Sequence, residues 1–114
     1  MTDEFGQLEE SLLFGSDADE CEVIGNDLAR VCEDYETFCS TIPDWLDIEE
    51  AWLGHGDPYE QCAHDYIMTR MGHGVGFWEE SDWDEKAGKV LTEMCRKQGS
   101  IETYKEDGYL HVLG

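Results

Sequence analysis

The sequence is poor in basic residues. Its 114 residues contain 7 Lys and Arg against 28 Asp and Glu, which gives a formal net charge of −21. The shortage is uneven, because residues 1–69 hold 19 acids and a single base, Arg30, whereas residues 70–114 hold 9 acids and 6 bases. A field of this sign repels nucleic acid and membrane surfaces and attracts basic grooves. We therefore expect no direct binding to nucleic acid or membrane, and a basic protein as partner.

The sequence also lacks the signals of export and of membrane insertion. No apolar run approaches the roughly 20 residues that a membrane-spanning helix needs. The first residues, Met1-Thr2-Asp3-Glu4, have no basic n-region of a signal peptide. The five cysteines are an odd number and none forms a C-x-x-C pair. We therefore expect a cytoplasmic protein whose thiols are reduced and act as small core hydrophobes.

What the sequence does contain is enough apolar material for a core. Hydrophobic residues make up 40% and aromatic residues 11% of the chain, which argues against a disordered acidic tail. A length of 114 residues suits one domain. We therefore expect a single domain over residues 1–114, with an acidic helical half, 1–64, and a hairpin–helix–hairpin half, 65–114. Acidity that serves only solubility or salt adaptation is the alternative to a functional surface.

Helical periodicity dominates the first half. A short helix is expected over residues 3–14, and a strongly amphipathic one follows from Ile24 and ends before Pro43. A third should begin at Pro43-Asp44, with Trp45, Ile48, Trp52 and Leu53 as its buried stripe. A short fourth helix, to about His64, is indicated by Asp57, Pro58 and Glu60, which suit the N-cap, N1 and N3 positions.

The second half alternates strand and helix patterns. Residues 66–70 and 75–78 favour two strands of a hairpin, and residues 101–105 and 109–113 favour another around Asp107-Gly108. Between them, residues 84–98 regain the helical period, and Gly99 is placed to end that helix. The predicted class is α+β: N-terminal acidic helices packed on a hairpin–helix–hairpin module, with an antiparallel sheet of about four strands.

No pattern selects a catalytic or metal site. His55, Cys62, His64 and His73 form the densest group of metal-ligand residues, but they lack the paired short spacings of zinc sites. None of the thiols is singled out as a nucleophile beside an imidazole. With 28 carboxylates, close acid pairs are guaranteed and select nothing. We therefore assign no catalytic residue, metal ligand or cofactor, and expect a protein that is not an enzyme.

The most specific string is Thr69-Arg70-Met71-Gly72-His73-Gly74-Val75-Gly76-Phe77-Trp78, preceded by His64-Asp65-Tyr66. It resembles a T-R-x-G-H-G-x-G-F-W block of small bacteriophage proteins of unassigned activity, over about residues 60–113. The resemblance implies phage origin, and hence location in the host cytoplasm. A structural role for this block suits it as well, because its glycines permit tight turns and Arg70 can pair with a carboxylate.

A second resemblance lies near the N-terminus. The strings Glu10-Ser11-Leu12-Leu13 and Glu22-Val23-Ile24-Gly25-Asn26 are similar to Glu-Ser-Ile-Leu and Glu-Val-Ile-Gly-Asn of the phage inhibitor of uracil-DNA glycosylase. The likeness covers about 17 residues. In that family the Glu-Ser element enters the DNA-binding groove of the enzyme. The resemblance therefore implies that Glu10 and Ser11 make this contact.

Together these features predict a phage-type DNA mimic that inhibits a basic, DNA-acting host protein. Carboxylates at helical i, i+3 and i+4 positions lie about 5–6 Å apart and can imitate a row of phosphates. The candidate targets are uracil-DNA glycosylase, a defence or repair nuclease, and a CRISPR effector. The predicted contact residues are Glu10, Ser11, Glu22, Glu33, Glu36, Asp44, Asp47, Glu49 and Glu50.

Two alternatives stay open. One is a small phage regulator or enzyme that uses the predicted His64–Trp78 hairpin, with Arg70 and His73 as its working residues. The other is a structural phage protein whose acidity is incidental. The sequence indicates no particular oligomeric state.

Overall fold

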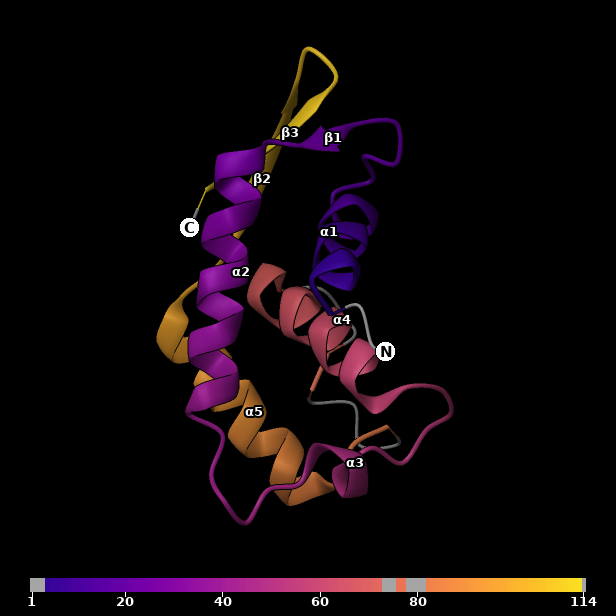
Figure 1. Cartoon of the computed structure of the whole chain (residues 1–114), viewed down its shortest axis with the longest axis vertical. Helices are drawn as coiled ribbons and strands as arrows, with labels where there is room; N and C mark the ends of the chain where they lie inside the picture. Colours follow the sequence, from indigo (N-terminus) through magenta and orange to yellow (C-terminus); the bar gives the residue numbers. More distant parts are fainter. Residues whose placement is uncertain (1–3, 73–75, 78–81, 114) are drawn as a thin grey trace.

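Helices form most of the structure, and a small sheet closes one end of it. The computed structural model describes residues 4–72, 76–77 and 82–113 (Figure 1). In this part, the elements are α1 (Glu4–Gly15), β1 (Glu22–Val23), α2 (Gly25–Ser40), α3 (Ile48–Ala51), α4 (Pro58–Met71), α5 (Glu85–Gln98), β2 (Glu102–Glu106) and β3 (Tyr109–Leu113). No helix among these residues is long and apolar enough to cross a membrane.

The amphipathic second helix is confirmed. α2 buries Val31, Tyr35 and Phe38, spaced at i, i+4 and i+7, and exposes Glu33 and Glu36. It ends at Ser40, before Pro43. The expected helix of residues 84–98 is also confirmed as α5, whose Asp84 N-cap side chain accepts a bond from the Ala87 amide at 3.2 Å.

The predicted strand over residues 66–70 is wrong, because this segment continues α4 to Met71. The helix begins at Asp57, whose carboxylate accepts from the Tyr59 amide at 2.9 Å, and it ends at Gly72 in the left-handed conformation with φ 76°. α4 packs against α1, α3 and α5, so several of its faces are buried. A helix covered on several sides loses the apolar period that marks a surface helix, and its run of large residues imitates a strand. Of the second predicted strand, Gly76 and Phe77 are described and neither is in a strand, while the other two residues lie outside the described part.

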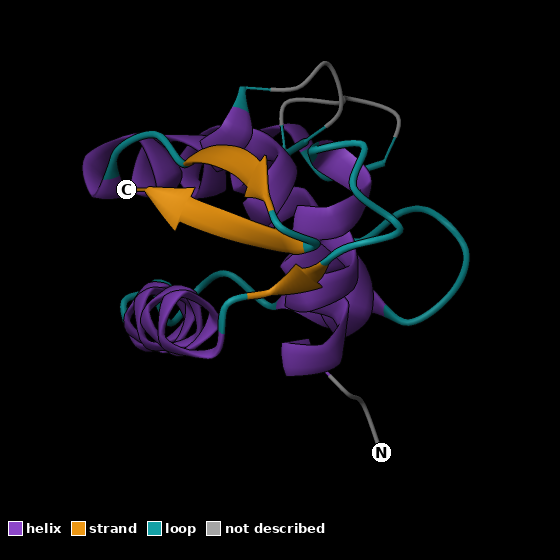
Figure 2. Cartoon of the chain, turned by 90° about the horizontal axis from the view of Figure 1, so that it is seen from above, coloured by secondary structure: helices purple, strands orange, loops and turns teal. Residues whose placement is uncertain are grey.

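The sheet is three-stranded and mixed, and the expected four-stranded antiparallel sheet is not formed. Its order is β1-β3-β2. The predicted last hairpin is confirmed: β2 and β3 are antiparallel, and Asp107 and Gly108 both have positive φ, 53° and 80°, as a tight hairpin turn requires. The strand that sequence reasoning missed is β1, two residues that pair parallel with β3 and lead directly into α2 (Figure 2). So short a strand carries no alternation from which to predict it.

Two side chains of α2 extend the pairing of β3 beyond β1. The Asp27 carboxylate accepts a bond from the Val112 amide at 3.0 Å, and Arg30 donates to the Val112 carbonyl at 2.7 Å. Arg30 also donates to Asp27 at 2.7 Å. The ion pair thus takes the place of a neighbouring strand and satisfies a sheet edge. Arg30, the only base among the first 69 residues, is thus used within the fold.

The third helix is much shorter than predicted. Only Ile48–Ala51 is helical, and Asp47 caps it by accepting from the Glu49 amide at 2.9 Å. The chain then extends, because Trp52 forms an antiparallel bridge with Trp83 and the Leu53 amide donates to the Asp82 carbonyl at 2.8 Å. As a result, Trp45 and Leu53 are 52% and 59% exposed instead of forming a buried stripe.

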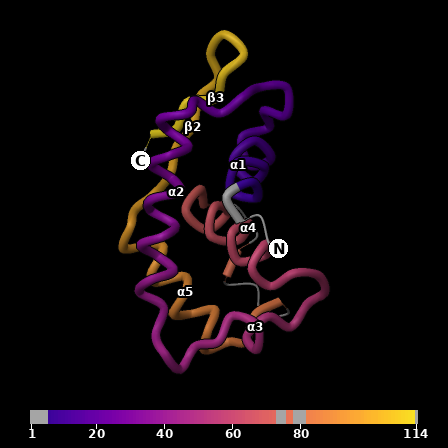
Figure 3. The backbone as a smooth tube through the Cα atoms, in the orientation of Figure 1, coloured from indigo at the N-terminus to yellow at the C-terminus, as the bar shows by residue number. Residues whose placement is uncertain are grey.

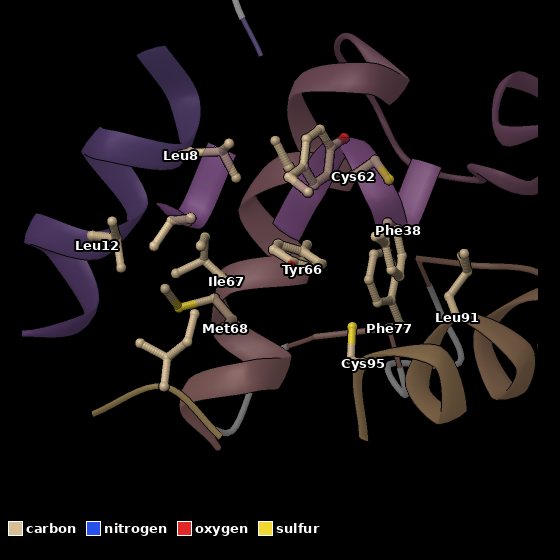
Figure 4. Close-up of a cluster of buried hydrophobic side chains, with 14 of the residues drawn as sticks. Leu8, Leu12, Phe38, Cys62, Tyr66, Ile67, Met68, Phe77, Leu91 and Cys95 are labelled. Atoms are coloured by element: carbon tan, nitrogen blue, oxygen red, sulfur yellow. The ribbon is translucent and has the colours of Figure 1, made fainter. Parts of the chain in front are cut away.

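An aromatic cluster joins the helices in the core (Figure 4). The Phe38 ring centroid lies 4.8 Å from that of Tyr66 and 5.8 Å from that of Phe77, and Phe77 lies 5.3 Å from Trp83. All four residues are at most 1% exposed. None of the five cysteines is in a disulfide; Cys21, Cys62 and Cys95 are buried as expected, whereas Cys39 is exposed. Burial raises the pKa of Cys95 to about 12.

We expect Asp27→Ala to lower the free energy of unfolding by about 1.5–3 kcal/mol, because the Val112 amide and Arg30 both lose a charged partner. Urea unfolding measures the change. Glu33→Ala, an exposed position on the same helix, is the control and should stay within about 0.5 kcal/mol of the parent. Equal effects of the two substitutions would contradict a special role of Asp27.

The same pair predicts a pH dependence. The bond from the Val112 amide, aided by Arg30, lowers the pKa of Asp27 below its ordinary value of 3.8. A lowered folded-state pKa adds stability above the unfolded-state pKa, and that stability is lost as the pH falls through the folded-state value. The difference in unfolding free energy between the parent and Asp27→Ala should therefore be constant near neutral pH and shrink below 3.8. A difference that grows on acidification would refute this assignment.

Candidate partner-binding surface

Six of the seven bases of the chain contact another side chain of the protein. Five of the seven form ion pairs with carboxylates. A sixth, Lys86, holds its ammonium 4.4 Å from the centre of the Trp45 ring. Four of the seven bases, Lys86, Lys89, Arg96 and Lys97, belong to α5. The carboxylates on the other elements are therefore largely uncompensated.

Most of the described carboxylates are exposed to solvent. Among the residues whose burial is described, Asp65 is the only buried acid. Its carboxylate accepts bonds from Trp83 Nε1 at 2.6 Å and Gln61 Nε2 at 2.9 Å, so its role is to hold α4 to the Trp83 segment. The strong net charge is thus displayed on the outside of ordered elements.

The predicted contact residues are spread along the molecule. Eight of them are exposed: Glu10, Glu22, Glu33, Glu36, Asp44, Asp47, Glu49 and Glu50. The ninth, Ser11, is completely buried, and its hydroxyl accepts a bond from Gln7 Nε2 at 3.0 Å. Glu22 lies in β1 and not on the helix face where it was expected, at the opposite end of the long axis from α3 (Figure 3). The eight exposed residues therefore do not form one row.

Four of them are gathered at the α3 end of the molecule. We call Asp44, Asp47, Glu49 and Glu50 the acidic end. Local bonds order this segment: Asp47 caps α3, and Glu49 accepts from the Tyr59 hydroxyl at 2.9 Å. The carboxylates of Asp47 and Glu49 therefore have defined positions on this surface.

A surface pocket of about 300 Å³ opens within the acidic end. It lies between the α3 segment and the first turn of α5, and we call it the Trp45 pocket. It is lined by Trp45, Leu46, Asp47, Glu50, Ala51, Leu53, Asp84, Lys86 and Ala87. Sequence reasoning missed Trp45, Leu53 and Asp84 as surface residues, because the helical period assigned the first two to the core. The only signal pointing the other way is that acids stand next to Trp45 and two residues after it.

The described histidines and cysteines do not assemble a metal centre. No group of three His, Cys, Asp or Glu side chains in this part of the chain is arranged to hold a metal ion. Cys62 is buried in the core, and His64 Nδ1 lies 3.0 Å from the structural carboxylate Asp65. His73 lies outside the described residues.

Arg70, the only Lys or Arg of the T-R-x-G-H-G-x-G-F-W block, is buried in the protein. Its side chain is 1% exposed and bonds to Asp34 at 2.8 Å. It also donates to the Gly99 carbonyl at 2.9 Å and the Gln98 carbonyl at 3.2 Å, at the C-terminal end of α5. In the same block, Thr69 Oγ1 accepts from the Phe77 amide at 3.2 Å. These contacts give Thr69, Arg70 and Phe77 of the block a structural role.

Comparisons with known proteins add no assignment: no protein-family model, no curated protein and no solved structure matches this chain.

We expect Arg70→Met to lower the free energy of unfolding by about 1.5–3 kcal/mol, because the Gln98 and Gly99 carbonyls and the half-exposed Asp34 carboxylate lose a charged donor. Arg96→Met on α5 is the matched control. Its side chain is 73% exposed, so it should change stability by less than about 0.5 kcal/mol. Chemical unfolding followed by circular dichroism measures both. A stable Arg70→Met protein with altered activity would instead favour a working role for the block.

Proposed function

We propose that this protein is a phage-type acidic inhibitor that occupies the basic DNA-binding groove of a host DNA-acting protein. The observation that carries the proposal is the distribution of charge: five of the seven bases are paired with carboxylates of the chain, whereas most of the described acids are exposed on ordered elements. A groove lined with Lys and Arg would relieve the repulsion among these acids on binding. Phage origin rests on the resemblance of residues 60–113.

The dimensions of the molecule suit such a groove. Its long axis measures 43 Å and the other two 28 and 26 Å. At about 3.4 Å per base pair, the long axis corresponds to roughly twelve base pairs of duplex. Acids lie at both ends of this axis, from Glu22 beside the sheet to the acidic end at α3. One molecule would therefore block a groove along a length comparable to a DNA-binding site.

The candidate targets remain uracil-DNA glycosylase, a defence or repair nuclease, and a CRISPR effector. The likeness to the glycosylase inhibitor contributes Glu10, which is exposed on α1. Ser11 does not belong to the proposed contact surface, because it is buried against Gln7. No observation favours the enzyme or structural alternatives, so inhibition of a DNA-acting protein is the function to test.

Inhibition should compete with DNA and weaken with salt. We expect added protein to slow uracil excision, duplex cleavage or guide-directed cleavage in a panel of purified enzymes, and excess duplex to restore the rate. Since the contact is mainly ionic, the inhibitory concentration should rise at least about tenfold between low and physiological salt. If every enzyme of the panel keeps its full rate at low salt, the proposal is wrong.

A pair of double variants tests whether the acidic end takes part. Asp44→Asn with Glu50→Gln should raise the inhibitory concentration about tenfold, because both lose charge at the proposed contact. Glu93→Gln with Glu102→Gln changes the net charge equally, but Glu93 is paired with Arg96 on α5. This control should raise the inhibitory concentration less than about threefold. Equal effects would show that only the total charge matters.

A further inference from the structure

The Trp45 pocket combines an aromatic face, an apolar wall and carboxylates in one place. Trp45 and Leu53 are 52% and 59% exposed, and both line the pocket. Asp47, Glu50 and Asp84 are its acidic lining residues. Large exposed aromatic and aliphatic side chains that meet in a pocket mark a contact surface more strongly than isolated ones. The charge of the lining indicates the sign of the group that would enter.

One cation already sits in this pocket. The Lys86 ammonium lies 4.4 Å from the centroid of the Trp45 ring, within cation–π distance. Lys86 reaches this place from the first turn of α5, and it is itself an exposed residue. An ammonium placed over an indole face beside three carboxylates shows that the pocket has room for a positive group where cation–π and ionic attraction both favour it. The chain thus supplies its own stand-in for a basic ligand.

The lining also suits the stem of a long basic side chain. Leu46, Ala51 and Ala87 are buried and give the pocket apolar walls. Lys and Arg place an apolar stem along such walls while the charged head keeps polar contacts. Arg has the further advantage of a planar head that stacks on an aromatic face and is more weakly hydrated than an ammonium.

We propose that the Trp45 pocket is the anchoring site for one arginine of the basic partner protein, whose guanidinium displaces Lys86 from the Trp45 face. This proposal rests on the proposed function, because it identifies where a basic groove makes its most specific contact. Charge complementarity selects the occupant: a second copy of this chain carries −21 as well and would be repelled. Lys86 is then a competitor within the chain that keeps the pocket partly occupied until the partner arrives.

If Lys86 competes with the ligand for the Trp45 face, removing Lys86 and removing Trp45 should change the affinity for a basic peptide in opposite directions. We expect Trp45→Ala to weaken binding of an acetylated, amidated hexa-arginine peptide by about fivefold to tenfold, the range of a partly desolvated cation–π contact. Lys86→Ala should tighten it by about threefold, because the Trp45 face is vacated. Both residues are exposed, so the fold should be kept, and circular dichroism of each variant checks this.

Lys97→Ala is the matched control for the loss of one positive charge. Lys97 is exposed on the same helix, 11 residues beyond Lys86. That separation is about 16 Å along the axis, more than the screening length of about 8–10 Å at physiological salt. Lys97→Ala should therefore leave the peptide Kd within about 1.5-fold of the parent. Titration of the ¹⁵N-labelled full chain should shift the Trp45 indole Nε1–H signal and give the Kd.

The outcomes distinguish binding at the Trp45 pocket from attraction by the overall negative charge of the protein. Opposite effects of Trp45→Ala and Lys86→Ala, with Lys97→Ala unchanged, support the arginine anchor. Equal tightening by Lys86→Ala and Lys97→Ala would overturn it, because the bulk field alone would explain binding. An unshifted Trp45 signal, or hexa-lysine binding more tightly than hexa-arginine, would overturn it too.

The anchor and the proposed function fail in different ways. If the enzyme panel is inhibited and Trp45→Ala inhibits as well as the parent, the anchor is wrong and groove occupancy stands. If no enzyme is inhibited but hexa-arginine binds with the expected variant pattern, the pocket accepts arginine and the inhibitor function is wrong. The two measurements therefore test the two proposals separately.

Discussion

The buried guanidinium of Arg70 is the contact on which the arrangement of α2, α4 and α5 depends. It extends from the last turn of α4 to Asp34 of α2 and to the carbonyls at the end of α5. Gln98 strengthens the same junction, since its side chain donates to the Asp34 carbonyl and accepts from the Tyr66 hydroxyl. A helix end needs donors for its last carbonyls, and here a neighbouring helix supplies them. The aromatic core lies beside this junction: Phe38 and Tyr66 come from α2 and α4, and Phe77 and Trp83 come from the segment between α4 and α5.

The scarcity of bases determines what remains on the surface. Arg70 is used in the interior, and Arg30, which is half-exposed, is used at the edge of β3, so two of the seven bases serve the fold directly. The acids outside have few internal partners, and their repulsion must be offset by burial of the core. An ordered acidic surface is the direct consequence. In a disordered chain the same charges would move apart, whereas here they are held on the surface of ordered elements.

Charge and apolar contact would contribute to binding in different ways. A dispersed acidic surface speeds the approach of a basic partner, and its effect is screened by salt. A pocket with an exposed tryptophan gives a local contact that slows dissociation. The acidic end holds both features, because the short α3 leaves Trp45 and Leu53 outside the core. This end of the molecule therefore has the means for both rapid association and a specific anchor.

The sequence by itself determined the helical elements α2 and α5, the last hairpin, the free thiols and the excess of surface acid. Each depends on local period, turn residues or composition. The tertiary structure decided that residues 66–70 are helical, that β1 joins β3, and that Trp45 lies outside while Ser11 lies inside. These outcomes depend on neighbours that are remote in the sequence. Other helices cover α4 on several sides, and residues 51–53 are extended because they pair with residues 82–84. Local pattern cannot encode such contacts, because burial of a side chain is a property of what packs against it.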